Sequence, residues 1–411
     1  MKILHLCFSN SGGGASIGAS RLHHAMLNYG LDSRLLVVNK NGSDPTIDTL
    51  PESKIRNFAL KYFNRRLRHT YTTRNSVNRS MNLLPNGAEK YINSLEADIV
   101  QMHWIGDDTI SIRGITRINK PVVWKLPDMW AISGAEHYSL PEDPKRYAEG
   151  YLTSNRPPHE RGLDLNRLIW LYKKWSWKNS DFTIVTPSKW LKQCAEESIL
   201  LKNRKIVNIP NPVDTKKYHP FPQDKVRSLF GLPSQKKLIM FGSMGATLDR
   251  RKGFGYLKDS LSYLKARYSP EQVELVVLGS ENNNTTYLES YRVHYLGTIQ
   301  DEELLIKAYN TADIFVLPSE MDNLPNVIKE ATCCGIPCVG FNIGGMPDMI
   351  DHQQNGYLAN PYSSYELAEG IAWVLDNNTQ ALKNKVRKKA EKLHDPDKIV
   401  DKYINLYKTL L

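Results

Sequence analysis

The sequence has no long uncharged apolar stretch and few cysteines. No run of about 18 or more apolar residues free of charge occurs, which excludes a transmembrane helix. The apolar opening at residues 3–8 is too short for a secretory signal peptide, so we expect the protein in the cytoplasm. Its five cysteines are an odd number, and their spacing fits neither a disulfide framework nor a zinc site. We expect reduced thiols in the core.

Acidic residues are absent between Glu52 and Glu89, although the chain is rich in charge elsewhere. The net charge of +11 arises entirely within residues 1–209. Its densest part comprises Lys54, Arg56, Lys61, Arg65, Arg66, Arg68, Arg74 and Arg79. Such a positive field attracts an anionic partner, which could be a phosphate-bearing acceptor, an anionic membrane surface or a nucleic acid. The alternative is a solvated basic face without a partner.

Short apolar runs alternate with helical stretches along the chain of 411 residues, which is long enough for two domains. Runs at 3–8, 35–38, 98–102, 121–124 and 182–185 predict one mostly parallel sheet, and runs at 237–241, 273–278, 293–296, 313–317 and 337–341 predict another. This pattern predicts an α/β protein of two Rossmann-like, doubly wound domains. We expect the domains to face a central cleft at the carboxyl ends of their strands.

Two prolines mark the predicted domain boundary. Pro210 and Pro212 interrupt regular structure in residues 206–214, where the charge balance also changes. We therefore place the first domain at 1–209, the second at 210–390 and a C-terminal helix at 391–411. An apolar stripe predicts that this helix packs back on the first domain, and it consists of Ile399, Val400, Tyr403, Ile404, Tyr407 and Leu411.

The segment 317–331 resembles the donor-site signature of GT-B glycosyltransferases of the family 4 type, in which two acids stand seven residues apart. Asp322 and Glu330 occupy the two acid positions, with aspartate where glutamate is usual. Residues 335–337 and 344–348 continue the motif in the expected order. The resemblance extends to 211–214, 186–191 and the glycine loop at 12–14. Residues 123–130 resemble the subgroup that builds bacterial exopolysaccharide and O-antigen.

The resemblance implies a metal-independent enzyme of EC class 2.4, which transfers sugar from a UDP- or GDP-sugar with retention of anomeric configuration. Glu330 would accept hydrogen bonds from the ribose, Asp322 would face the sugar, and Lys252 would flank the diphosphate. Ser243 stands where the family has an arginine, and we expect Arg251 or Arg250 to supply that charge. Further donor contacts are expected from Gly13, Gly14, Gly242, Thr298, Asn323, Leu324 and Asn326. Neither a metal ion nor another cofactor is expected.

The expected acceptor is a saccharide, carried on a lipid diphosphate, and it would bind the first domain. Pro127 stands where the family has a histidine near the donor sugar. Asp128, His103 or His137 could take over that role, and Asp128 joins Asp322 and Lys252 as a candidate catalytic residue. Because proline has no side-chain donor, a nucleotide-sugar-binding protein with weak or no turnover stays open as the alternative.

Two further expectations concern surfaces. A nucleic-acid partner is not expected, since the basic segment has few aromatic residues for base stacking and no nucleic-acid motif occurs. We expect peripheral attachment to the inner face of the plasma membrane, because a lipid-linked acceptor lies there. Residues 172–178 mix aromatic residues with lysines. They could touch lipid headgroups, or they could form a buried tryptophan pair with exposed lysines.

Overall fold

The computed structural model describes residues 1–51, 62–67, 69–242, 249–280 and 287–411. Contacts divide the chain into two compact units, the first of Met1–Asn211 with Asp397–Leu411 and the second of Pro212–Pro396. The division after Asn211 lies close to the predicted boundary at 209/210. Part of the basic segment and Ser243 fall outside the described residues.

The first unit is built on a seven-stranded sheet in the order β3-β2-β1-β5-β6-β8-β9. All its neighbouring strands are parallel. The strands are β1 (Lys2–Ser9), β2 (Asp32–Asn39), β3 (Ile47–Thr49), β5 (Ile99–Met102), β6 (Val122–Lys125), β8 (Thr183–Thr186) and β9 (Ile206–Asn208). The order reverses between β1 and β5, which makes their carboxyl ends the switch point where such sheets bind ligands.

Helices cover both faces of this sheet. Side chains of β1 alternate between the faces, so that Leu4 and Leu6 join one apolar cluster while Ile3 and Cys7 join others. The helices are α1 (Gly14–Asn28), α3 (Ala88–Ser94), α4 (Ile112–Ile115), α5 (Arg146–Glu149), α6 (Leu165–Trp177) and α7 (Lys189–Glu197). A small antiparallel pair, β4 (Tyr71–Thr72) with β7 (Arg161–Gly162), lies outside the sheet.

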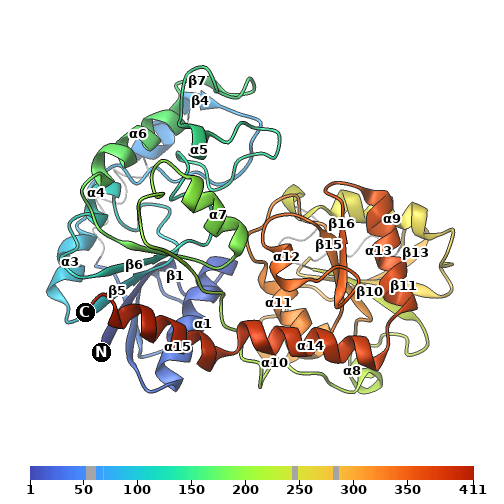
Figure 1. Cartoon of the computed structure of the whole chain (residues 1–411). Coiled ribbons are helices and arrows are strands. Elements are labelled where there is room, and N and C mark those ends of the chain that lie inside the picture. The colour runs from blue at the N-terminus through green and yellow to red at the C-terminus, as the bar shows by residue number, and fades with distance from the viewer. Residues whose placement is uncertain (52–61, 68, 243–248, 281–286) are drawn as a thin grey trace. The chain divides into compact units, whose positions relative to one another are not determined.

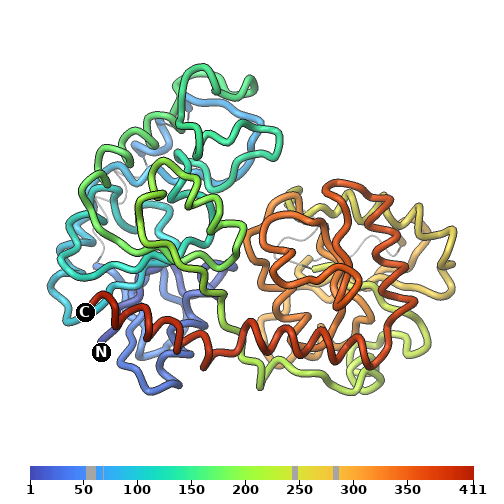
Figure 2. Tube along the Cα trace, in the orientation of Figure 1, coloured from blue at the N-terminus to red at the C-terminus, as the bar shows by residue number. Residues whose placement is uncertain are grey.

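The C-terminal helix α15 (Pro396–Lys408) belongs to the first unit. Ile399, Val400 and Tyr403 are buried in one cluster with Ile3 and Leu22 of β1 and α1. The hydroxyl of Tyr407 donates a 2.8 Å hydrogen bond to Gln101 Oε1 on β5. The last part of the chain thus lies beside the first (Figure 2). Leu411 does not continue the predicted stripe, because it is 67% exposed beyond the end of the helix.

The second unit repeats the architecture with a seven-stranded sheet in the order β12-β13-β11-β10-β14-β15-β16. Its strands are parallel except for the edge pair β12–β13, and the order reverses between β10 and β14. The strands are β10 (Lys237–Gly242), β11 (Val273–Leu278), β12 (Tyr287–Leu288), β13 (Tyr291–Tyr295), β14 (Ile314–Leu317), β15 (Cys338–Phe341) and β16 (Gly356–Ala359).

The helices of the second unit cover its sheet from two sides, α9 and α13 on one and α10, α11 and α14 on the other (Figure 1). They are α8 (Gln223–Leu229), α9 (Phe254–Leu264), α10 (Glu302–Tyr309), α11 (Asn326–Cys333), α12 (Met346–Met349), α13 (Ser364–Asp376) and α14 (Gln380–His394), with a 3₁₀ turn η1 at Arg250–Lys252. The two Rossmann-like units confirm the predicted α/β class. All five cysteines are buried free thiols, as expected.

Candidate functional site

The loops that follow β10 and β14 meet at the switch point of the second unit. Lys252 ends η1 and Asp322 follows β14, and their side chains form an ion pair with 2.7 Å between Nζ and Oδ2. The two side chains are only 19% and 14% exposed. Partial burial strengthens their attraction relative to a surface pair. The structure therefore places a cation and a carboxylate where an open α/β sheet binds its ligand.

Two glycines permit this close approach of loops. Gly253 has φ +73°, and a Cβ there would lie 1.8 Å from the carbonyl oxygen of Pro318. Gly344 has φ +52°, and a Cβ there would lie 1.9 Å from the carbonyl oxygen of Asp322. Neither position could accept a side chain without displacing backbone. The backbone around Lys252 and Asp322 is thus fixed from both sides.

The two arginines proposed to replace the missing family arginine differ in their surroundings. The Arg251 guanidinium lies 2.7 Å from Asp249 Oδ2, and its side chain is 31% exposed. The Arg250 side chain is 88% exposed, with Nε 3.9 Å from Glu320 Oε1. Gly242 is the last residue of β10, close to this turn in sequence. Both arginines thus have a carboxylate partner, and the Arg250 side chain is the more exposed of the two.

Helix α11 begins at Asn326, directly after the loop that carries Asp322. Pro325 occupies the N-cap position and no side chain caps the helix. Asn323 and Leu324 are buried, and Asn326 is half-buried. The start of α11 therefore lies in the same connection between β14 and α11 as Asp322.

Glu330 lies within α11 and is 4% exposed. Its Oε2 accepts a 2.7 Å hydrogen bond from the hydroxyl of Tyr309, the last residue of α10. Burial raises the pKa of Tyr309 well above its usual value, and the nearby Glu330 carboxylate raises it further, so the tyrosine stays a donor. Sequence reasoning missed Tyr309, because no motif marks it and it stands far from Glu330 in the chain.

The turn expected to read the nucleotide base follows β13. Thr298 is exposed there, and the neighbouring Gly297 accepts a 2.8 Å hydrogen bond from the backbone N–H of Gly279 after β11. This bond joins the turn to the carboxyl end of β11, which pairs directly with β10. Thr298 therefore lies at the same edge of the sheet as Gly242.

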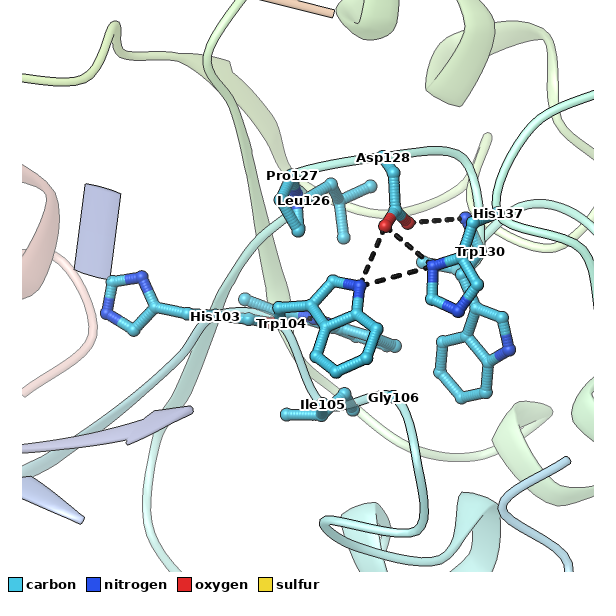
Figure 3. Close-up of a pocket in the computed structure, with 11 residues that line it drawn as sticks. His103, Trp104, Ile105, Gly106, Leu126, Pro127, Asp128, Trp130 and His137 are labelled. Carbon is cyan, nitrogen blue, oxygen red and sulfur yellow. Dashed lines mark hydrogen bonds and ion pairs between the residues drawn. The ribbon is translucent and has the colours of Figure 1, made fainter. Parts of the chain in front are cut away.

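In the first unit, Asp128 and His137 come together at the carboxyl ends of β5 and β6 (Figure 3). His137 Nδ1 lies 2.6 Å from Asp128 Oδ2, which also accepts a 2.9 Å hydrogen bond from the indole of Trp104. The backbone N–H of Trp130 donates to Asp128 Oδ1 at 2.9 Å. These partners fix the orientation of the carboxylate.

A hydroxyl fixes the other side of the His137 ring. Its Nε2 lies 2.8 Å from Ser80 Oγ, which also accepts a hydrogen bond from the backbone N–H of Asp107. The pocket next to this cluster, bordered by Pro127, has a volume of about 10 Å³, enough for about one water molecule. Trp104 and Ser80 were missed by sequence reasoning, although Trp104 stands just after a predicted strand, where ligand-binding residues gather.

His103 does not join this cluster, although it lines the same pocket. Its ring points away from Asp128 (Figure 3), and its Nε2 lies 2.8 Å from Nδ1 of His5 on β1. Both histidines are buried, and burial lowers the pKa of each well below its usual value. The structure therefore brings Asp128 and His137 together, whereas His103 is buried beside His5 of β1.

The glycine loop of the first unit precedes α1. Gly13 is the N-cap residue, Gly14 is the first helical residue, and no side chain caps the helix. A Cβ at Gly13 would meet nothing within 4 Å. A ligand phosphate could therefore approach this helix start closely, as such loops allow.

Only part of the basic segment is described. Arg65 and Arg66 are exposed, whereas Arg74 is 2.6 Å from Glu142 and Arg79 lies over the Tyr71 ring at 5.3 Å. Residues 52–61 and Arg68 lie outside the described residues. Arg66 also has a partner, since its Nε donates a 3.1 Å hydrogen bond to the Tyr62 hydroxyl, so three of these four arginines have structural partners.

The described residues contain neither a candidate metal cluster nor a candidate membrane-spanning helix. In the described ranges, no cluster of three or more histidine, cysteine, aspartate or glutamate residues could hold a metal ion. Over the same part of the chain, no helix has both the length and the apolar character needed to cross a bilayer.

Sequence comparison places the second unit among known proteins. The model of a family described as Glycosyl transferases group 1 matches residues 235–377, which include Lys252, Asp322 and Glu330. A Haemophilus influenzae protein named only as an uncharacterized glycosyltransferase is 26% identical over 218 residues, which are 52% of this chain and 57% of that protein.

A Campylobacter jejuni relative is 28% identical over 218 residues, 50% of this chain and 55% of its own. It is named N,N'-diacetylbacillosaminyl-diphospho-undecaprenol alpha-1,3-N-acetylgalactosaminyltransferase. The chain spans about half the length of the curated relatives it matches.

Solved structures match over the whole chain. HepE of Anabaena, in complex with UDP-glucose, gives a TM-score of 0.67 at 16% identity and covers 100% of both chains. Sucrose-phosphate synthase from Thermosynechococcus elongatus gives 0.66 at 17% identity, covering 100% of this chain and 99% of that one. WaaG, described as a glycosyltransferase involved in lipopolysaccharide biosynthesis, gives 0.62 at 15% identity and covers 97% of this chain and 98% of its own. Residues 235–377 therefore match the model of the group 1 glycosyltransferase family, and the whole chain has the GT-B fold of two Rossmann-like domains.

Proposed function

We propose that this protein is a retaining glycosyltransferase of the family 4 type. It transfers a sugar from a UDP- or GDP-sugar to a saccharide carried on a lipid diphosphate, in the synthesis of cell-surface polysaccharide. The observation that carries the proposal is the pair of Lys252 and Asp322 at the switch point of the second unit, 2.7 Å apart. A nucleotide sugar needs both a cation for its diphosphate and an acceptor for its sugar hydroxyls.

The proposed roles follow from the chemistry of the donor. Lys252 stabilises the negative charge that develops on the departing diphosphate, because a fixed cation needs no reorganisation. Asp322 holds Lys252 in place before the donor binds and then accepts a hydrogen bond from a sugar hydroxyl. Glu330, oriented by Tyr309, accepts from the ribose.

The proposed reaction needs no nucleophile from the chain. The bond between the anomeric carbon and the diphosphate oxygen breaks, and a bond to the acceptor oxygen forms on the same face of the sugar. The acceptor proton passes to the departing diphosphate oxygen. Asp128 and His137 bind and orient the acceptor in this scheme. The hydrogen bond from Trp104 fixes the Asp128 carboxylate, and the hydrogen bond with Ser80 fixes the His137 ring.

The proposal of a lipid-linked acceptor is supported by two of the similar proteins. The Campylobacter jejuni relative is named for a diphospho-undecaprenol substrate, and WaaG is described as acting in lipopolysaccharide biosynthesis. An acceptor of this kind lies at a membrane surface, so peripheral attachment of this protein to an anionic leaflet is part of the proposal.

Removal of the Glu330 carboxylate is expected to abolish most donor turnover. The purified protein, incubated with a panel of UDP- and GDP-sugars, is expected to release free nucleotide slowly from one of them. Glu330→Ala should lower that rate by about ten-fold or more, because a charge-assisted hydrogen bond to the ribose contributes about 1.5–3 kcal/mol. Release of nucleotide from no sugar in the panel would contradict the transferase activity, and an unchanged rate in Glu330→Ala would contradict the donor site.

Loss of the Tyr309 hydroxyl should weaken the donor site through Glu330. Tyr309→Phe removes the 2.7 Å hydrogen bond to Glu330 Oε2, and we expect the donor KM to rise several-fold while the second unit loses about 1–2 kcal/mol of stability. Tyr291→Phe is the matched control, since its buried hydroxyl donates to the Tyr268 carbonyl at 2.6 Å. An equal rise in KM in both variants would show a general loss of stability instead.

A further inference from the structure

Helix α6 has an exposed apolar stripe on its outer side. Leu168, Leu171 and Trp175 are 47%, 42% and 62% exposed, and Tyr172 is half-buried between them. Their spacing of three, four and seven residues places all four on one face of the helix. We call these four residues the α6 stripe. Figure 1 shows α6 on the outer flank of the first unit.

A row of positive charge runs beside the α6 stripe. Arg167, Lys174 and Lys178 are exposed and follow each other at seven and four residues, which aligns them along the helix. The chain has no acidic residue between Asp164 and Asp181. The guanidinium of Arg113 on α4 lies 5.3 Å above the Trp175 ring and adds charge at the end of the stripe. We call Arg167, Lys174 and Lys178, the residue that follows the helix, the basic row.

The inner side of the same helix holds the loop that carries Asp128 and His137. Lys173 is fully buried, and its Nζ donates to the carbonyl oxygens of Trp130, Ser133 and Gly134 at 2.5, 3.2 and 2.7 Å. The ammonium also lies 3.6 Å from the centre of the Trp130 ring. One helix therefore connects an exposed apolar stripe to the proposed acceptor loop.

We infer that the outer face of α6 docks on an anionic lipid surface. Leucine side chains and an exposed tryptophan enter the interface between headgroups and acyl chains, while adjacent lysine and arginine side chains pair with lipid phosphates. A second copy of the chain fits this face less well, since a twofold contact would bring the two basic rows together without acidic partners. The link to acceptor binding rests on the proposed function.

Docking by α6 explains how a soluble donor and a lipid-bound acceptor could reach the same protein. With the α6 stripe in the headgroup region, the loop held by Lys173 lies one helix thickness, about 10 Å, from the lipid surface. A diphosphate headgroup that projects from the bilayer would span that distance and reach the loop. The outer face of α6 thus identifies an anionic lipid surface as the partner on the acceptor-binding side of the protein.

Vesicle flotation tests the inference directly. The full chain should float with phosphatidylcholine vesicles that contain phosphatidylglycerol, and weakly or not at all with phosphatidylcholine alone. The double variant Leu171→Ser with Trp175→Ser should bind anionic vesicles about ten-fold more weakly, because two side chains that enter the interface are lost. Lys174→Ala and Lys178→Ala should each weaken binding about five-fold, and salt should weaken it further.

The matched control removes apolar side chains of similar exposure from the second unit. Leu229 and Tyr263 are 58% and 53% exposed, and Leu229→Ser with Tyr263→Ser should leave flotation unchanged. Equal flotation of the α6 double variant and the unmodified chain would overturn the inference. So would a dimer in solution that only the α6 double variant disrupts, since that result would assign the face to a second copy.

A second measurement separates this inference from the proposed function. Nucleotide release from a soluble sugar donor without vesicles should be the same in the α6 double variant and the unmodified chain. Absence of release in both proteins, with flotation as expected, would refute the proposed function and leave the docking surface intact. Normal release without flotation of the unmodified chain would refute the docking surface alone.

Discussion

Replacement of Lys252 by alanine is expected to slow nucleotide release from the donor by about two to three orders of magnitude. The ammonium is 19% exposed and lies 2.7 Å from Asp322 Oδ2. Its charge is therefore already positioned before the diphosphate departs. Loss of one preorganised charge aimed at a developing anion has an effect of this size because water cannot reorganise as quickly or as favourably in its place. Steady-state release of free nucleotide measures it.

A control for Lys252 is available on α9, the helix that follows it in the chain. Lys258 is exposed on α9, and Lys258→Ala should leave the rate unchanged. Comparison of Arg250→Ala with Arg251→Ala then decides which arginine supplies the second charge. A double-mutant cycle with Asp322→Asn should give a coupling energy of about 0.5–3 kcal/mol, since the two side chains are in contact. Nucleotide release at the unmodified rate in Lys252→Ala would refute its role.

Acid should destabilise the first unit well above the pH at which carboxylates titrate. Burial lowers the pKa of His23 to about 4, with His24 adding to the effect. Burial also lowers the pKa of His5 and His103. Between pH 6.5 and 4 these histidines become protonated in the unfolded chain but stay neutral in the folded chain. The free energy of unfolding therefore falls as the pH falls. For His23 alone the loss is about 3 kcal/mol, from a usual pKa of about 6.5.

Tryptophan fluorescence can follow this loss, because every tryptophan except Trp373 belongs to the first unit. Urea midpoints should fall steadily from pH 6.5 to pH 4, and His23→Gln should flatten that slope. The control is His352→Gln, which changes an exposed histidine of the second unit. Midpoints that stay constant over this range, or a His23→Gln slope equal to that of the unmodified chain, would refute buried neutral histidines.

The strands most fully predicted from sequence are those made mainly of apolar residues. Both faces of a parallel sheet are covered, so β14 is an unbroken apolar run, and only His5 and Glu274 interrupt the predicted runs of β1 and β11. The edge strands β9 and β16 were not predicted. The prolines that follow β9 indicated a domain boundary and not a strand. β16 has only four residues and begins with glycine, so it has no long apolar run.

Side-chain environment was harder to predict than strand position. Residues 172–178 offered either headgroup contacts or a buried tryptophan pair with exposed lysines. The structure buries Trp177 and Lys173 but exposes Trp175 and Lys174, because a helix turns each successive residue by about 100°. The alternative of a buried tryptophan pair was therefore wrong.

The candidate site shows the same limit. The resemblance named Asp322 and Glu330 from their spacing, but their contacts come from residues distant in sequence. Lys252 reaches Asp322 from η1, which follows β10, and Tyr309 reaches Glu330 from α10. Pairings of this kind depend on strand order, which no local pattern specifies.

Because α15 belongs to the first unit, the order of synthesis and the order of folding differ in this protein. The ribosome completes residues 212–396 of the second unit before it releases Ile399, Val400, Tyr403 and Tyr407. An apolar surface of α1 and the sheet therefore stays uncovered until α15 has emerged from the ribosome. The half that is made first is the half that is finished last, so truncation near the C-terminus would disturb the unit built around the N-terminus.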